Sequence, residues 1–308
     1  MQNNILAYVA LIIVCIVWGT TYFFMRIGVE TFPPFLFSAL RQVIAGGLIL
    51  TFLKLLGKLR LSKKTLLTQT ILGILLISLG SGVIGWTERF IPSGLAALIV
   101  STLPMYVIFI NYVAGLENHK PNSYILIGLL LGSLGIFLIF RDNLMDFINP
   151  DYLVGTLIAF GASFCWAAGS VFSKSQSSRN DVMTNAALQM LLGGVVLFIM
   201  SYFLDDYTEI NGVTSQSLYA LGYLTVIGST IAYPCYIYAL NKLPIGIVSL
   251  YAYINPFIAL ILGYFVLNER ITWITTGAFM TVLLAIYCIN KGYKMKVEKI
   301  NIRALKNK

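Results

Sequence analysis

The sequence predicts an all-α integral membrane protein with ten transmembrane helices, arranged as two inverted five-helix repeats. Three observations lead to this class. Of the 308 residues, 58% are hydrophobic and only 11% are charged, whereas about 25% of residues are charged in a typical soluble domain. Stretches of about 18 or more residues with almost no charge recur along the chain, which is the pattern of membrane-spanning helices. A skeleton of proline and glycine residues also recurs in the second half, as an internal duplication would leave.

The predicted helices of the first half span about residues 5–25, 35–56, 67–88, 93–114 and 122–140. Those of the second half span about residues 152–173, 184–204, 216–240, 245–266 and 271–290. The links between them are short, and none can hold a soluble domain. We therefore predict a first repeat over residues 1–148, a second repeat over 149–290 and a basic cytoplasmic tail over 291–308.

Lysine and arginine are distributed asymmetrically between the predicted links. If the N-terminus is cytoplasmic, only Arg26, Arg89, Arg141 and Arg270 lie outside and Arg41 lies within a span, so 16 of the 21 basic residues lie inside. Positive residues are retained on the cytoplasmic side of a membrane, so we expect both termini to be cytoplasmic. The basic tail is expected to set this topology and to attract anionic lipid headgroups. Nucleic-acid binding is the weaker alternative for the tail.

Several classes of site are not supported by the sequence. The four cysteines lie in apolar runs without metal-ligand spacing, which indicates buried thiols. No GxxxxGK[ST] phosphate-binding loop is present, and no catalytic group can be assembled around the one histidine, His119. We therefore predict a protein that is not an enzyme and that needs no cofactor or metal.

The recurring skeleton has a defined spacing. Four residues are followed, 152 positions later, by the same residue types: Pro92, Gly94, Pro104 and Glu117 by Pro244, Gly246, Pro256 and Glu269. Because each repeat has an odd number of helices, the second copy must cross the membrane in the opposite direction. Such repeats place a binding site near the membrane midplane. Chance recurrence is the alternative, since proline and glycine are common in membrane helices, but four matches at one spacing favour duplication.

The candidate binding residues are polar or aromatic groups expected near that midplane: Trp18, Gln42, Trp86, Ser101, Trp166, Gln189, Tyr233, Tyr253 and Asn255. Trp18 and Trp166 are 148 residues apart and lie near the centres of their spans, away from the interfaces where tryptophan usually collects. We expect them to form opposite walls of a cavity, where aromatic faces bind flat apolar groups or cations. Ordinary helix packing is the alternative, because 13% of the chain is aromatic.

The candidate gating and coupling residues are Arg41, Glu88, Pro104 and Pro256. An ionised Arg41 inside its span must be paired or must face water, and Glu88 is its expected partner. The pair would be a gate or a static contact. As the carboxylate expected within a span, Glu88 is also the candidate proton-coupling group. Pro104 and Pro256 are expected at matched positions, where each interrupts a helix.

The motifs resemble those of a known family. The Trp18-Gly19-Thr20 triplet, the second-helix segment from Arg41 to Gly47, the Ile91–Leu98 segment and Pro256 with Gly263 are similar to the EamA family of the drug/metabolite transporter superfamily. The Trp86–Arg89 stretch is similar to the YedA-like branch of exporters in that family. The resemblance covers essentially the whole chain.

The resemblance implies a secondary transporter of small metabolites in the bacterial inner (plasma) membrane, working by alternating access. An amino-acid or metabolite exporter is the expected function. Uptake of a cationic amine such as choline is an alternative, and a membrane structural or lipid-handling protein without a solute path is another. The expected partners are a small-molecule substrate, membrane lipid and protons as the coupling ion, with no nucleic acid, in a monomer or weak homodimer.

Overall fold

A computed structural model of the chain describes residues 4–59, 61–116, 121–141, 146, 149–176, 181–267 and 273–306. Within these residues, eight helical stretches are long and apolar enough to cross a membrane, and two shorter apolar helices, Ser123–Ile139 and Ile245–Ile258, complete a set of ten. The predicted all-helical membrane fold is therefore confirmed. Glu117 and Glu269, which belong to the recurring skeleton, lie outside the described residues.

Each half contributes five membrane-crossing stretches. The first half consists of α1 (Ile5–Thr31), α2 (Pro34–Leu55), a continuous stretch of α3 (Lys63–Leu72), η1 (Gly73–Gly82) and α4 (Val83–Thr87), the pair α5 (Ser93–Val100) and α6 (Leu103–Val113), and α7 (Ser123–Ile139). The second half consists of α8 (Pro150–Ser175), α9 (Val182–Leu204), a stretch of α10 (Ser215–Tyr223), η4 (Leu224–Ile231) and α11 (Ala232–Lys242), the pair α12 (Ile245–Val248) and α13 (Tyr251–Leu267), and α14 (Trp273–Lys306). A short 3₁₀ helix, η3 (Tyr207–Gly212), links α9 to α10.

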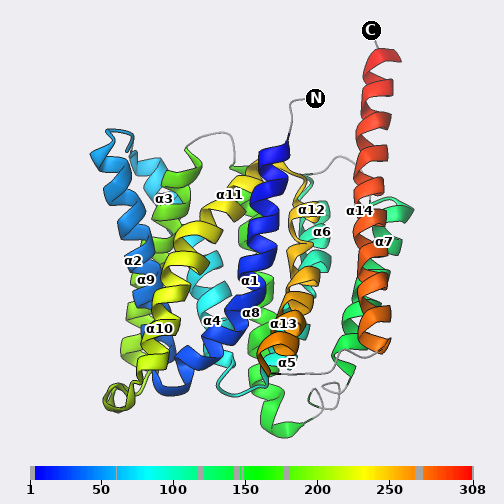
Figure 1. Cartoon of the computed structure of the whole chain (residues 1–308). Helices are drawn as coiled ribbons and strands as arrows, with labels where there is room; N and C mark the ends of the chain where they lie inside the picture. The colour runs from blue at the N-terminus through cyan, green and yellow to red at the C-terminus, as the bar shows by residue number, and fades with distance from the viewer. Residues whose placement is uncertain are drawn as a thin grey trace.

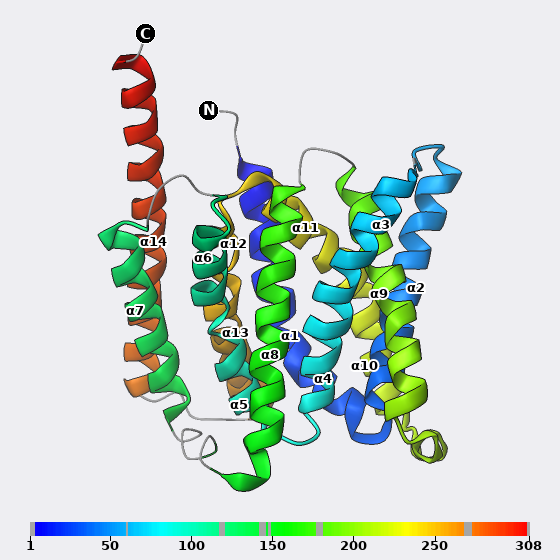
Figure 2. The same ribbon diagram turned by 180° about the vertical axis from the view of Figure 1, so that it is seen from behind.

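The two halves run in opposite directions. In Figure 1, α1 descends from the end of the bundle that carries both termini, whereas its counterpart α8 climbs toward that end. Figure 2 shows the same bundle from behind, with α7 and α14 together at one edge and α2 and α9 at the other. The observed arrangement is that of inverted repeats.

The sequence sets the helix ends in an ordinary way. Side-chain oxygens of polar residues accept hydrogen bonds from the free N–H groups of the first turns, at Ser62, Asn122, Asn149, Asp181 and Thr214. Asp205 provides a cap between the halves, because its carboxylate accepts from the backbone N–H groups of Phe35 (3.3 Å) and Leu36 (2.8 Å) at the start of α2.

The first helix is longer than predicted. It ends at Thr31 instead of near residue 25, because the boundary of an apolar run does not mark where helical hydrogen bonding stops. Arg26, expected in an external link, therefore stands in α1, where its guanidinium donates to the backbone carbonyl of Glu88.

Several matched features of the two halves are 148 residues apart. This spacing relates Trp18 to Trp166 and the helix break at Ser101–Thr102 to the break at Ser249–Leu250. Pro92, Gly94 and Pro104 keep the 152-residue spacing before and after that break, whereas the break itself has moved, since α12 has four residues where α5 has eight. Since a helical turn has about 3.6 residues, the second half has shifted the link between these helices by one turn.

The shift corrects one prediction. Pro104 is in the first turn of α6, where a proline costs no hydrogen bond. Pro256 lies inside α13, where it cannot donate to the carbonyl four residues earlier. The two prolines therefore match in sequence spacing but not in their position relative to the helix break.

Glycines allow the central helices to touch along their backbones. A Cβ atom at Gly46 would lie 2.7 Å from the carbonyl oxygen of Ala187, and one at Gly193 would lie 2.6 Å from the carbonyl oxygen of Gly73. Small residues at helix crossings are typical of membrane bundles, where close packing replaces the hydrophobic effect. These contacts hold α2, α9 and η1 together at the edge of the bundle where α2 and α9 lie (Figure 2).

Gly46→Ala is expected to destabilise the protein by about 1–3 kcal/mol, because the added methyl group collides with backbone atoms of α9. Gly47→Ala is the matched control, since a Cβ atom there meets nothing within 4 Å. Unfolding of the purified protein in mixed detergent micelles would measure both. Equal stability of the two variants would contradict the close backbone contact.

Candidate functional site

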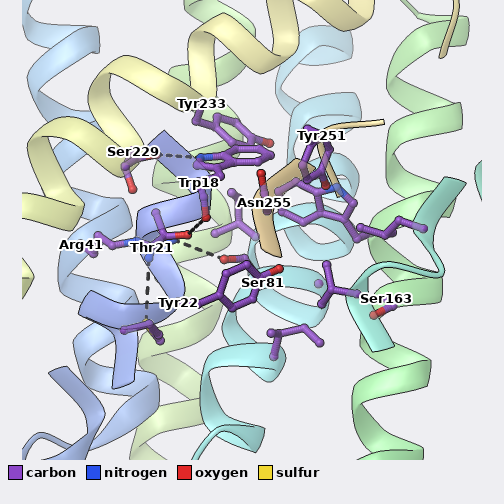
Figure 3. Close-up of a pocket in the computed structure, with 18 of the residues that line it drawn as sticks. Trp18, Thr21, Tyr22, Arg41, Ser81, Ser163, Ser229, Tyr233, Tyr251 and Asn255 are labelled. Carbon is purple, nitrogen blue, oxygen red and sulfur yellow. Dashed lines mark hydrogen bonds between the residues drawn. The ribbon is translucent and has the colours of Figure 1, made fainter. Parts of the chain in front are cut away.

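A cavity of about 110 Å³ lies between the two halves (Figure 3). The first half contributes residues of α1, α2, η1, α4, α5 and α6, and the second half contributes residues of α8, η4, α11 and α13. At about 30 Å³ for each water molecule, the cavity has room for roughly four waters, or for a small solute of similar size.

One wall of the cavity is aromatic. The rings of Trp18 and Trp166 meet edge to face with centroids 5.5 Å apart, and Tyr251 lies 5.0 Å from Trp18. Tyr233 adds a further ring, 6.4 Å from Trp166. The two predicted tryptophans thus both line the cavity, but they lie in contact with one another and not across it.

Two π-helical segments also line the cavity. η1 contributes Gly80 and Ser81, and η4 contributes Gly228 and Ser229, which stand 148 residues later in the matched helix. The indole Nε1 of Trp18 donates to the Gly228 carbonyl over 3.2 Å. π-helical turns are rare and occur often at functional sites. The repeated Gly-Ser pair is the sequence signal that could have identified Ser81 and Ser229.

Unpaired polar atoms concentrate at the cavity. Among the described residues, nine buried side-chain nitrogen or oxygen atoms have no hydrogen-bond partner. Six of the nine belong to residues that line the cavity: Arg41, Gln42, Glu88, Ser163, Trp166 and Ser229. An unpaired polar group buried in a low-dielectric interior costs about 1–3 kcal/mol, so this conformation concentrates an unfavourable polar cost in the residues around the cavity.

Arg41 and Glu88 both line the cavity, but the expected ion pair between them is not formed within 4.0 Å. Arg41 donates from Nη2 to Ser81 over 3.3 Å, and its Nε has no partner. Glu88 is 1% exposed, and its Oε2 also has no partner. In this conformation the two charges therefore face a shared space.

Asn255 lines the cavity and also connects two helices. With its amide oriented to suit its neighbours, Nδ2 donates to the carbonyl oxygens of Cys15 (3.2 Å) and Tyr251 (2.9 Å). The amide thus joins α1 to α13 at the edge of the cavity.

The two predicted glutamines have different surroundings. Gln42 lines the cavity with Oε1 unpaired. Gln189 lies behind the wall, where Nε2 donates to Gln69 (2.6 Å) and Oε1 accepts from the Tyr233 hydroxyl (2.7 Å). Gln189 therefore positions Tyr233 and does not itself reach the cavity.

The remaining candidates do not line this cavity. Trp86 stacks on Phe35 with centroids 5.7 Å apart. Ser101 donates to the carbonyl oxygen of Leu98 over 2.6 Å. The ring of Tyr253 packs against Gly132 of α7. Pro104 and Pro256 also lie outside the lining. All five are buried or half-buried, and apolar periodicity could not show which side of a fully apolar helix faces the cavity.

An inverted pair of five-helix halves around a polar cavity defines a class of protein, namely secondary transporters that carry a small solute through a site near the midplane. The EamA-like transporter family matches residues 5–141 and 153–291. The chain therefore belongs to the EamA-like transporter family, and it is a multi-pass membrane transporter.

Similar proteins agree with this assignment. The uncharacterized inner membrane transporter YedA of Escherichia coli strain K12 is 32% identical over 285 residues, which is 92% of this chain and 90% of that protein. The uncharacterized transporter YoaV of Bacillus subtilis strain 168 is 29% identical over 264 residues, or 85% of this chain and 89% of that protein. A solved crystal structure superimposes with a TM-score of 0.76 at 17% identity, over 92% of this chain and 95% of that one, which shows the shared fold.

Gln189→Leu is expected to lower the stability of the protein by about 1–3 kcal/mol, because it leaves Gln69 and Tyr233 buried without partners. Gln42→Leu is the matched control and should not reduce stability, since it removes an unpaired acceptor. Detergent unfolding monitored by tryptophan emission would measure both. A larger loss for Gln42→Leu would contradict the assigned roles.

Proposed function

We propose that the chain exports a small metabolite, most simply an amino acid, across the bacterial inner membrane by alternating access. The observation that carries the proposal is the cavity between the inverted halves, where six residues present unpaired polar atoms. A structural or lipid-handling protein would not need this concentration of unpaired groups at its centre. Residues 1–148 and 149–290 act as the two moving halves, and both termini lie in the cytoplasm.

The composition of the cavity favours an amino acid. The guanidinium of Arg41 can donate hydrogen bonds to the carboxylate of a solute, which makes a strong charge-assisted contact. Gln42 also lines the cavity, and its amide oxygen, which has no partner in the protein, would accept from an ammonium group once a side-chain rotation exposes it. The rings of Trp18, Trp166 and Tyr251 give an apolar surface for a side chain. A cationic amine such as choline would use the aromatic surface and leave Arg41 without a partner.

The proposal is tested with purified protein in liposomes, using radiolabelled amino acids and quaternary amines with and without a proton gradient. We expect transport of an amino acid, and we expect Arg41→Gln to raise its KM at least about tenfold, because a charged hydrogen bond is lost. Lys291→Gln, which removes a charge from the contact between Lys291 and Tyr124 on the α7–α14 pair, is the control and should leave KM unchanged.

Two outcomes would contradict the proposal. Transport of amines alone, insensitive to Arg41→Gln, would establish amine uptake instead. If neither amino acids nor amines are transported, the substrate belongs to another chemical class and both proposals are wrong.

Glu88 is proposed as the proton-coupling group, because it is a buried acidic residue that lines the cavity. Glu88→Gln should abolish stimulation of transport by a proton gradient while retaining exchange of labelled for unlabelled solute. Asp151→Asn, at the exposed start of α8, is the control. If a proton gradient stimulates transport by the Glu88→Gln variant as strongly as transport by the unmodified protein, then Glu88 is not the proton-coupling group.

A further inference from the structure

A buried hydrogen bond lies next to the cavity, toward the end of the bundle that carries the termini. The hydroxyl groups of Ser170 and Tyr236 are 2.5 Å apart and buried. The ring of Tyr236 lies 5.0 Å from Trp18 and 5.6 Å from Trp166. Beyond these rings lies a second, much smaller cavity of about 10 Å³, lined by Tyr236 and Ser249. In Figure 1 the α11–α12 link beside it lies at the end of the termini.

The repeat relates this closed contact to a second pair of residues. At the 148-residue spacing that relates Trp18 to Trp166 on the same helices, Ser170 corresponds to Tyr22. At the same spacing, Tyr236 corresponds to Glu88. Helical hydrogen bonding continues to Glu88, whose N–H donates to the Ile84 carbonyl over 3.2 Å, so the register reaches both residues.

The corresponding pair is open. Tyr22 and Glu88 both line the main cavity, and no hydrogen bond between them is found among the described residues. Glu88 lies at the end of α4, and α4 ends at the side of the bundle opposite the termini (Figure 1). One half thus holds its pair closed while the other holds the equivalent pair apart, which is the asymmetry that inverted repeats show in one of two alternating states.

We propose that the Ser170–Tyr236 hydrogen bond is a latch, meaning a contact that must break before the cavity opens toward the termini. Tyr22 and Glu88 form a second latch on the opposite side, which closes when the Ser170–Tyr236 latch opens. In that state the Tyr22 hydroxyl donates to the Glu88 carboxylate. The contact gives the buried carboxylate a partner when closure removes it from the water of the cavity. This assignment rests on the alternating access proposed above, and it adds Tyr22, Ser170 and Tyr236 to the residues that control it.

The test measures access to each cavity from each side of the membrane. A reporter cysteine is placed in the main cavity by Ser229→Cys or in the small one by Ser249→Cys. The full chain is sealed in vesicles of known orientation and exposed to a membrane-impermeant maleimide. Mass spectrometry of the labelled peptides identifies each site, so the four native cysteines stay in place.

The two latches should respond with opposite signs. Tyr236→Phe should raise labelling of Ser249→Cys from the terminal side about two- to tenfold, as expected for the loss of one hydrogen bond, and should lower labelling of Ser229→Cys from the other side. Adding Tyr22→Phe to that variant should reverse both changes. Tyr207→Phe is the matched control, because it removes another tyrosine–serine hydrogen bond (2.8 Å to Ser201) on η3, outside both cavities.

The latch assignment is overturned if Tyr22→Phe and Tyr236→Phe shift labelling in the same direction, or if neither shifts it. If Tyr236→Phe does not accumulate in the membrane, Ser170→Ala replaces it in the same labelling experiment, because it removes the other partner of the same hydrogen bond. Labelling requires no substrate. Opposite shifts without amino-acid transport would therefore support the latches and contradict the export proposal, whereas transport without shifts would contradict the latches alone.

Discussion

A bilayer allows polar groups to stay unpaired only where they meet water or a solute. This constraint organises the structure. The helix breaks before Leu103 and Tyr251 and the two π-helical segments all adjoin the same region, and most of the unpaired buried side-chain atoms belong to residues that line it. The irregular backbone and the unsatisfied side chains thus have one common explanation, which is a path for a polar solute through the centre of the bundle.

Close backbone contacts make that path possible. Gly46 and Gly193 bring α2 and η1 against α9, so the two halves stay joined while other residues of α2 and η1 line the cavity. The aromatic rings form one wall of the space, and Arg41, Glu88 and Tyr22 are among its other lining residues. The proposed solute, with an apolar part and a charged part, would lie between the rings and Arg41.

Much of the fold could be predicted from the sequence, because membrane helices are long apolar runs and a duplication leaves matched residues at a constant spacing. The sequence also paired Trp18 with Trp166 across the repeats, although it placed them on opposite walls of the cavity and the structure brings them into contact. It failed where a spacing was taken as uniform: the one-turn shift hid the correspondence between Glu88 and Tyr236 and paired two prolines that differ in position.

Side-chain directions were the other source of error. Gln189 turns to Gln69 and Tyr233, whereas Gln42 faces the cavity. Helices that are apolar on every face give no periodic signal to separate these cases. Arg41 and Glu88 were expected to pair because both charges needed a partner, but in the structure both line one cavity without an ion pair, and Arg41 donates to Ser81 instead.

A structure determined by electron cryomicroscopy with a transported solute present tests the central claim most directly. The account predicts density for the solute in the cavity, with its apolar part against Trp18 and Trp166 and its carboxylate at Arg41. Solute density elsewhere, with Arg41 paired to Glu88 and the central cavity filled by side chains, would contradict it.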